Sequence, residues 1–269
     1  MKLFVEHETH YQFAEPANHS VQYLRLTPRN DSCQRILSWT VTSSSHLTPW
    51  VDGFENSAHI ALKKGPHDEV LVTVRGEVET WSTTGILPAD DGLPPLIFLR
   101  ETRFTLVTQS IERPAKPSNE LIERDGRLAA MHDLTSRIAD SVRYQSGFTN
   151  VETDADHALS QGVGVCQDHA HLFIASARVL NVPARYVSGY ILAGSGNQSH
   201  LASHAWAEAY IDDLGWVSFD PTNRQSATEE YIRMAIGFDF ASAGPVRGMR
   251  EGGGIEEMDV RVQIEQSQS

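Results

Sequence analysis

The chain has 269 residues and a formal net charge of −13 at pH 7, because 35 aspartate and glutamate residues outnumber 22 lysine and arginine residues. A chain this acidic offers no basic surface to a phosphate backbone or an anionic lipid, so neither nucleic acid nor a membrane is expected as a partner. With 40% hydrophobic residues, the chain is long enough to bury one large or two modest cores, and we favour two.

Two further features predict the compartment. The apolar run at residues 1–5 is followed by Glu6 and Glu8, which makes it too short for a signal peptide, and no stretch approaches membrane-spanning length. The two cysteines, Cys33 and Cys166, fall in different predicted domains, and a reducing compartment with two free thiols explains them more simply than a disulfide. We expect a cytoplasmic protein in which Cys33 is structural.

Residues 3 to about 110 alternate strand-like runs with turn signals, which is typical of a β-rich domain. Prolines at 88, 94 and 95 interrupt a connecting loop, and Pro114 and Pro117 mark a second break. The sequence therefore predicts a β-rich N-terminal domain at 1–112 and a second domain at 113–269. The strand-like runs are 3–7, 21–26, 36–41, 57–62, 69–74 and 76–81.

Two helices are expected in the second domain. An apolar stripe from Ile122 to Val142 predicts one long helix from about Asn119 to Arg143. A second stripe, at spacings of three and four, predicts a helix from Cys166 to Leu180 that Asn181 and Pro183 end. Its members are Ala170, Phe173, Ile174, Ala177 and Leu180.

Three strands are expected after these helices. Residues 203–211 and 216–222 both read as strands, joined by a polar turn at 212–215. After a run of three glycines, the tail alternates Met258, Val260, Val262 and Ile264 as a closing strand. The mixture of helices and antiparallel strands predicts an α+β fold.

Cys166 is the residue that points most directly to chemistry. A thiol at a helix N-terminus faces unpaired backbone N–H groups and the positive end of the macrodipole, which favour the thiolate. His204 opens one of the two predicted strands and Asp220 closes the other, so an antiparallel hairpin brings both to one end of the sheet. A nucleophile, a base and a group that orients the base are then available.

The hairpin register decides whether His204 and Asp220 meet. With a four-residue loop, Ile211 pairs with Trp216 and the two side chains point to opposite faces of the sheet. A one-residue bulge, or a three-residue loop in which paired residue numbers add to 426, places them on one face as diagonal neighbours. We expect one of these two arrangements.

Four motifs resemble the bacterial transglutaminase-like family, whose members are relatives of papain-type cysteine proteases. They are Gly-Val-Cys-Gln-Asp at 164–168, Pro-Ala-Arg-Tyr-Val-Ser-Gly-Tyr at 183–190, His-Ala-Trp-Ala-Glu at 204–208 and Gly-Trp-Val-Ser-Phe-Asp-Pro-Thr-Asn at 215–223. The resemblance implies a catalytic triad of Cys166, His204 and Asp220. It also implies a papain-like core, in which a central helix packs on an antiparallel sheet, behind a β-rich N-terminal domain.

The resemblance extends to Tyr23-Leu24-Arg25-Leu26-Thr27-Pro28 and to the C-terminal segment around Gly237-Phe238-Asp239-Phe240 and Pro245-Val246-Arg247-Gly248. The family usually has arginine, tyrosine and a second aspartate where this chain has Phe238, Phe240 and Ser242. These departures are expected to remove polar groups near the rim of the site and to affect substrate range.

A metal site at Cys166, His169 and His171 is the competing interpretation. On a helix, the side chain five residues after another lies about 140° away from it, so these three cannot converge on one ion. No metal and no cofactor are therefore expected, and His169 and His171 are predicted to be packing or surface residues. Asp168 is expected to cap the helix, and Trp206 either belongs to a half-buried strand or forms a wall of the cleft.

The predicted triad attacks an amide carbonyl and forms a thioester, which water or an amine then resolves. Water as acceptor makes a peptidase or amidase, which we favour, and a primary amine makes a transglutaminase. A non-catalytic peptide-binding scaffold is the alternative outside the enzymes. The backbone N–H of Cys166 can donate to the oxyanion, and Gln161 and Tyr144 are candidates for the second donor. The expected partner is a peptide or protein substrate.

Overall fold

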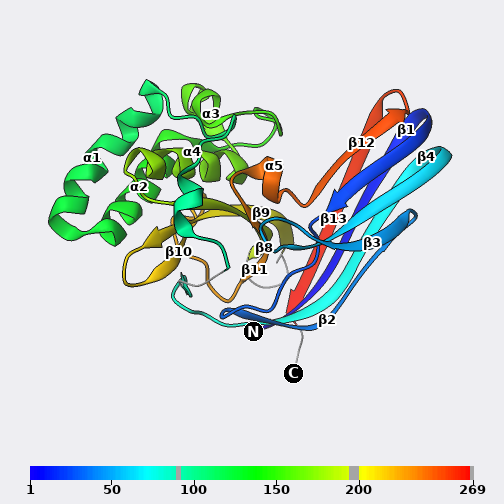
Figure 1. Cartoon of the computed structure of the whole chain (residues 1–269), viewed down its shortest axis with the longest axis horizontal. Helices are drawn as coiled ribbons and strands as arrows, with labels where there is room; N and C mark the ends of the chain where they lie inside the picture. Colours follow the sequence, from blue (N-terminus) through cyan, green and yellow to red (C-terminus); the bar gives the residue numbers. More distant parts are fainter. Residues whose placement is uncertain (89–91, 194–199, 267–269) are drawn as a thin grey trace.

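The computed structural model describes residues 1–88, 92–193 and 200–266, arranged in two lobes (Figure 1). One lobe is a curled sheet of long strands, drawn at the right of the figure. The other contains the helices and a second sheet. Among the described residues, no helix is both long enough and apolar enough to cross a bilayer.

Two very long strands form the centre of the first sheet. Strand β1 spans Lys2–Leu24 and β4 spans Ser57–Thr80, and the two pair antiparallel along most of their length. On its other edge, β4 pairs with β2 (Gln34–Ser43) and β3 (His46–Val51). The predicted runs 3–7 and 21–26 are thus the two ends of one strand. The exposed segment Ala14-Glu15-Pro16, where the pairing with β4 shifts, contains a proline and hides that continuity in the sequence.

The C-terminal segment completes this sheet. Strand β12 (Val246–Gly252) and strand β13 (Glu256–Gln266) pair one after the other with the free edge of β1. The closing strand predicted from the alternation at 258–264 is confirmed. The division at 112/113 stays a prediction, but this pairing places the last strands of the chain in the first sheet and not beside the helices.

The long helix predicted at 119–143 is wrong in its bounds, because the chain forms two helices there. Helix α1 spans Gln109–Asp125 and α2 spans Arg127–Ser141. Gly126 separates them with φ 87°, a conformation that side-chain-bearing residues rarely adopt. Pro114 and Pro117 lie inside α1 and not before it. Burial of Ile111, Ala115 and Ser118 on one face of α1 offsets the cost of two missing N–H groups.

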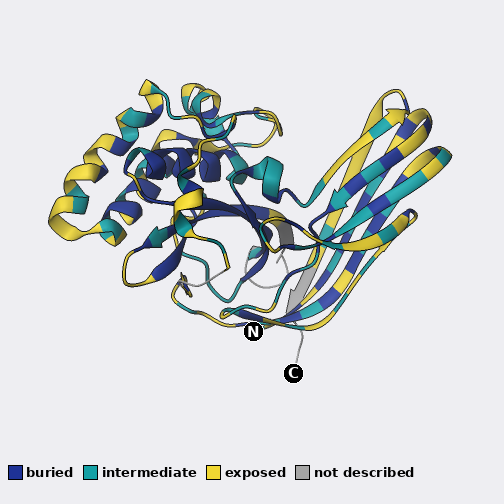
Figure 2. Cartoon of the chain, in the orientation of Figure 1, coloured by how far each residue is buried: buried dark blue, intermediate teal, exposed yellow. Residues whose placement is uncertain are grey.

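Helix α4 (Cys166–Val179) is the centre of the second lobe. It agrees with the predicted helix to within one residue and is buried along nearly its whole length, as Figure 2 shows. One side packs on a five-stranded sheet, where the Phe173 and Phe219 rings stack with centroids 5.2 Å apart. The sheet order is β11 (Tyr231–Gly237), β8 (Ala184–Ala193), β9 (His200–Ile211), β10 (Gly215–Phe219) and β5 (Ile86–Leu87). The α+β class, with a central helix on an antiparallel sheet, is confirmed.

Short elements complete the lobe. The 3-10 helix η1 spans Pro95–Leu99, helix α3 spans Ala155–Gln161, and helix α5 spans Phe240–Ala243. Strands β6 (Arg143–Tyr144) and β7 (Val163–Gly164) pair in parallel just before α4.

The two lobes share an apolar core and a buried ionic network. Tyr190, Ile232 and Met234 of the second sheet pack in one cluster with Leu3 and Val5 of β1. Elsewhere at the junction, Glu208 accepts hydrogen bonds from the buried guanidinium groups of Arg185 and Arg233, and Arg233 also pairs with Asp31 at 2.6 Å. Breaking one partner of such a network leaves a buried charge uncompensated, so the network holds the lobes together.

Candidate active site

Cys166 is the first residue of α4 and is partly exposed. The turn before it is fixed by Asp168, whose carboxylate accepts the backbone N–H of Val165 at 2.8 Å and the hydroxyl of Thr149 at 2.6 Å. The predicted capping role of Asp168 is confirmed. As the first residue of the helix, Cys166 carries one of the amide N–H groups that have no partner within the helix.

The hairpin register brings His204 and Asp220 together. Strands β9 and β10 pair Ile211 with Gly215 and Ala207 with Phe219, so paired numbers add to 426 and the turn holds three residues. This is one of the two arrangements expected from the sequence. The imidazole Nε2 of His204 lies 2.6 Å from Oδ2 of Asp220. His204 and Asp220 are both buried, at 8% and 0% exposure.

Asp220 accepts more hydrogen bonds than the one from His204. The amide of Asn223 donates to Oδ2 at 2.7 Å and the phenol of Tyr231 donates to the same atom at 2.7 Å. The backbone N–H of Thr222 donates to Oδ1 at 3.0 Å. Burial alone would raise the pKa of Asp220, but the hydrogen bonds from His204, Asn223 and Tyr231 hold it below its usual range.

His204 is supported from behind by Trp206. The two rings stack with centroids 6.1 Å apart, and the indole meets the Tyr231 ring edge-on at 5.3 Å. Gly189 pairs with His204 across β8 and β9, and a Cβ there would lie 2.6 Å from the indole. Trp206 is 1% exposed and does not line the cavity at Cys166. Of the two interpretations of Trp206, the strand residue is correct, although residues 204–209 are buried on both faces of the strand and not on one, and the cleft wall is wrong.

The charge on His204 is set by its two neighbours. Burial lowers the pKa of the imidazole, but the hydrogen bonds to Asp220 and to the Cys166 thiol, with the attraction of both groups, raise it to about 10. Since Nε2 is engaged by Asp220, Nδ1 is the ring nitrogen left to face the sulfur. A protonated imidazole beside a thiol favours the thiolate.

Cys166 and His204 line the same cavity, which has a volume of about 180 Å³. Its walls are mostly aromatic or small, and they come from α4, β8, β9, β11 and the segment around α5. They include Tyr186, Tyr190, Ser188, Gly189, Ser203, Met234, Phe240 and Pro245. The cavity is therefore a small, largely apolar chamber with the thiol and the imidazole on its wall.

His169 and His171 are buried packing residues, in agreement with one of the two predicted roles. The ring of His169 lies between Thr222 (Nδ1, 2.9 Å) and the carbonyl of Val142 (Nε2, 2.8 Å). His171 accepts the backbone N–H of Phe240 at 3.0 Å and stacks on Phe104. Within residues 1–88, 92–193 and 200–266, no group of three histidine, cysteine or acidic side chains is arranged to hold a metal ion.

The three C-terminal residues that differ from the usual pattern of the family lie in different places. Phe240 lines the cavity, as expected for a residue at the rim. Phe238 does not line it, because its ring packs edge-on against Phe54 in a cluster with Phe98. Ser242 hydrogen-bonds Asp239 at the start of α5.

The two candidates for the second oxyanion donor are placed differently. Tyr144 pairs with Gly164 two residues before Cys166, and burial and the nearby Cys166 raise the pKa of its phenol. The side chain of Gln161 is exposed and hydrogen-bonded to His157. Tyr144 is thus the candidate close to the thiol.

The sequence reasoning missed the residues that surround Asp220. Asn223 stood inside a quoted motif, and an amide three residues after an aspartate at a strand end is a signal for a turn that caps its carboxylate. Tyr231 had no such signal. It reaches Asp220 from strand β11, whose position depends on the pairing of the whole sheet.

Comparisons with known proteins agree with this architecture. The model of the transglutaminase-like superfamily matches residues 119–221, which include Cys166, His204 and Asp220. The model of the bacterial transglutaminase-like N-terminal region matches residues 3–79. An uncharacterized protein of Mycobacterium leprae is 29% identical over 98% of each chain. An uncharacterized protein of Mycobacterium tuberculosis is 29% identical over 91% of this chain and 86% of the relative.

A solved structure shares the whole fold. It is a protein of Cytophaga hutchinsonii provisionally assigned as a cysteine protease, with a TM-score of 0.77, 24% identity, and coverage of 100% of this chain and 91% of that one. At this identity the likeness shows a common fold. The two family matches, over residues 3–79 and 119–221, show that the chain belongs to the transglutaminase-like superfamily, with the N-terminal region of its bacterial members.

Proposed function

We propose that the protein is a cysteine hydrolase that cleaves peptide or side-chain amide bonds through a thioester. Cys166 is the nucleophile, His204 is the general base and acid, and Asp220 orients His204. The observation that carries the proposal is the shared cavity of Cys166 and His204, with the Nε2 of His204 2.6 Å from a buried carboxylate.

The geometry supports each step of this reaction. The thiolate attacks the carbonyl carbon, and the tetrahedral oxyanion accepts the backbone N–H of Cys166, with Tyr144 as the candidate second donor. The imidazolium of His204 gives its proton to the leaving amine as the C–N bond breaks. His204 then takes a proton from water, which attacks the thioester and releases the acid and the thiol. Asp220 stabilises the imidazolium throughout and keeps Nδ1 directed to the sulfur.

The test combines a variant with an analysis of products. Cys166→Ala is expected to abolish turnover of glutamine-containing peptides without lowering the thermal midpoint, because alanine fits sterically at a helix N-terminus. Retained turnover in this variant would exclude Cys166 as the nucleophile. Products are read by mass with and without an excess of a primary amine. Faster incorporation of the amine than of water would instead assign an acyltransferase that uses the same three residues.

A further inference from the structure

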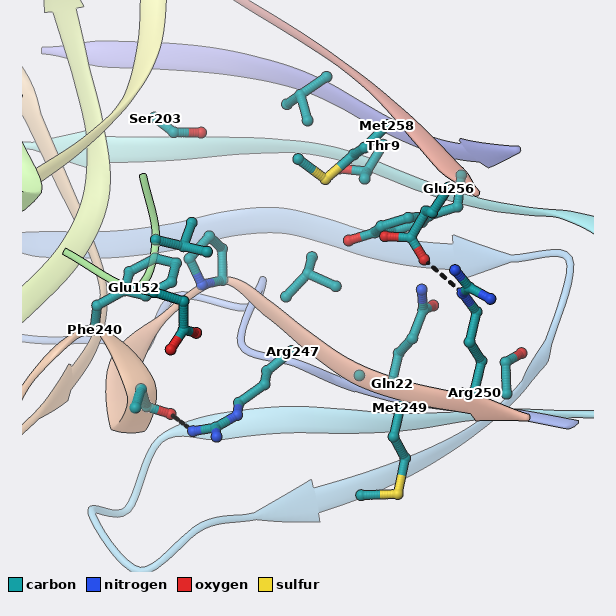
Figure 3. A pocket seen from close by; sticks show the side chains of 18 of the residues that line it. Thr9, Gln22, Glu152, Ser203, Phe240, Arg247, Met249, Arg250, Glu256 and Met258 are labelled. Carbon is teal, nitrogen blue, oxygen red and sulfur yellow. Dashed lines mark hydrogen bonds and ion pairs between the residues drawn. The ribbon is translucent and has the colours of Figure 1, made fainter. Parts of the chain in front are cut away.

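A second and larger cavity lies between the first sheet and the second lobe. It has a volume of about 720 Å³, against about 180 Å³ for the cavity at Cys166. Strands β1, β12 and β13 form one side, and residues 103–104, 151–152 and 240–241 form the other (Figure 3). Ser203, Phe240 and Pro245 line both cavities. The larger cavity, here called the groove, therefore adjoins the chamber that contains the thiol.

The groove wall formed by β1 carries hydrogen-bonding side chains without charge. They are His7, Thr9, Tyr11, Ser20 and Gln22. Burial lowers the pKa of His7 to about 4, so its imidazole is neutral, and it hydrogen-bonds Tyr190 and Thr9. A wall of this kind suits the uncharged amide groups of a polypeptide and not an ionic ligand.

Gln22 is the residue whose hydrogen bonding is incomplete. Its side chain is 7% exposed, and its Oε1 has no hydrogen-bond partner among the described residues. It pairs with Gly248 of β12, where a Cβ would lie 2.9 Å from Gln22 Cγ, so the glycine makes room for the Gln22 side chain itself. A buried acceptor without a donor is costly and rare in folded proteins. Gln22 lines the groove, so a rotation of its side-chain amide would present this acceptor to an N–H of a ligand bound there.

The charged residues at the groove are paired with one another or with backbone. Arg103 pairs with Glu152 at 2.7 Å, and Arg250 pairs with Glu256 at 3.0 Å. Arg247 donates to the carbonyl of Ala241 at 2.9 Å. Figure 3 shows the Arg250 and Arg247 contacts. Three arginines against two glutamates leave the groove with one net positive charge, at Arg247, so its preference for a charged ligand is weak.

Apolar side chains provide the remaining contact surface. On β13, Met258 is 58% exposed and Val260 is 42% exposed, and both line the groove. Met258 is flexible and polarizable, so it adapts to side chains of different shape. An extended peptide would have its amide groups at the polar wall and its side chains on this apolar surface.

We propose that the groove binds an extended, uncharged stretch of the substrate polypeptide next to the amide that Cys166 attacks. This inference rests on the proposed function, since it extends the same site. The main-chain N–H groups of the peptide donate to Gln22 Oε1, and its apolar side chains pack on Met258 and Val260. The chain then passes Ser203, Phe240 and Pro245 into the smaller cavity.

The experiment measures peptide binding to the full chain carrying Cys166→Ala, so that turnover does not interfere. The probe is a fluorescein-labelled decapeptide of alanine, valine and asparagine with one central glutamine, followed by fluorescence anisotropy. Adding Gln22→Leu is expected to weaken peptide binding about five- to tenfold, because one hydrogen bond between the peptide and the protein is lost. The thermal midpoint should not fall, because the variant removes an unsatisfied buried acceptor. Met258→Glu is expected to weaken binding about tenfold, through the loss of apolar contact and the burial of a charge.

Ile255→Glu is the matched control. Ile255 is 76% exposed, lies between β12 and β13 three residues before Met258, and does not line the groove. The affinity of the Ile255→Glu variant for the decapeptide should stay within about twofold of the affinity of the chain that carries Cys166→Ala alone. Equal affinities for all variants, no binding of the neutral peptide, or tighter binding of an analogue with lysine or aspartate at alternate positions would each refute the groove assignment.

Failure of the groove and failure of the proposed chemistry give different results. If wild-type protein cleaves peptides but Gln22→Leu and Met258→Glu leave KM unchanged, the groove inference is wrong and the hydrolase proposal stands. If the decapeptide binds with the expected pattern but no thioester forms at Cys166, the groove stands and the hydrolase proposal fails.

Discussion

The phenol of Tyr231 donates to Oδ2 of Asp220 at 2.7 Å, the same oxygen that lies 2.6 Å from the imidazole of His204. Two donors on one oxygen stabilise its negative charge, and Asn223 adds a third. The basicity of Asp220, and through it the orientation of His204, depends on a tyrosine eleven residues farther along the chain.

Tyr231→Phe is expected to reduce kcat/KM about tenfold and to move the acid limb of the pH profile upward by about one unit. Removing the donor raises the pKa of Asp220, so the carboxylate becomes protonated at a higher pH and no longer supports His204. The measurement is kcat/KM against pH. Tyr210→Phe, in a ring that packs on Trp216, is the control and should leave the limb in place. An unchanged acid limb in Tyr231→Phe would mean that the tyrosine only fills space.

The two cysteines should differ strongly in reactivity. Burial, with the nearby Asp31, raises the pKa of the Cys33 thiol to about 12. Cys166 lies on a cavity wall beside His204, a cation at neutral pH. Brief treatment with iodoacetamide at pH 7.5 should therefore label Cys166 at least tenfold faster than Cys33. Peptide mapping by mass spectrometry gives both rates. His204→Ala should slow labelling of Cys166 alone, and equal rates at the two thiols would contradict an activated nucleophile.

Thermal stability should be greatest between about pH 6.5 and 8.5. Burial lowers the pKa of His7 and of His171 to about 4, so between pH 4 and 6.5 the unfolded chain binds more protons and stability falls as the pH falls. The raised pKa of His204, about 10, acts in the opposite direction. Because the imidazolium takes its proton from the Cys166 thiol, the folded and unfolded chains hold equal numbers of protons at this pair until the unfolded thiol ionises at about pH 8.5. From there to about pH 10 the folded state holds the extra proton, and stability falls as the pH rises.

Thermal midpoints across pH 4–10 test this. His204→Gln should flatten the alkaline limb, and His7→Gln should flatten the acid limb. Each variant should reduce the difference in bound protons between the folded and unfolded states by about one. If neither variant changes its own limb, these histidines do not control the pH dependence.

Gly189→Ala should destabilise the fold by about 1–3 kcal/mol. The added methyl would lie 2.2 Å from the carbonyl oxygen of Ile232 and 2.6 Å from the Trp206 indole. Since Trp206 supports His204, activity should fall along with stability. Gly53→Ala is the matched control, because a Cβ there has nothing within 4 Å. Denaturant unfolding gives both values, and equal stability of the two variants would show that the sheet adjusts at no cost.

The sequence was most informative where local pattern and chemistry coincide. The stripe from Ala170 to Leu180 defined α4, and the need for His204 and Asp220 on one face correctly limited the hairpin register. Local pattern failed where tertiary packing decides. Gly126 ends a helix within the stretch that the apolar residues from Ile122 to Val142 had assigned to one helix, and β1 continues through the exposed segment at 14–16 because β4 and the C-terminal strands pair with it on either side. The environment of Asp220 depends on Tyr231, which sheet pairing alone brings into reach.

The pairing of β1 with β12 and β13 has a consequence for biosynthesis. Strand β1 leaves the ribosome early, whereas residues 246–266 leave after the whole helical lobe has been made. Until then, one edge of β1 has no strand beside it and can pair with another copy of the chain. The order of synthesis therefore favours completion of the helical lobe first. The curled sheet closes last, and chains truncated before residue 246 should aggregate during expression.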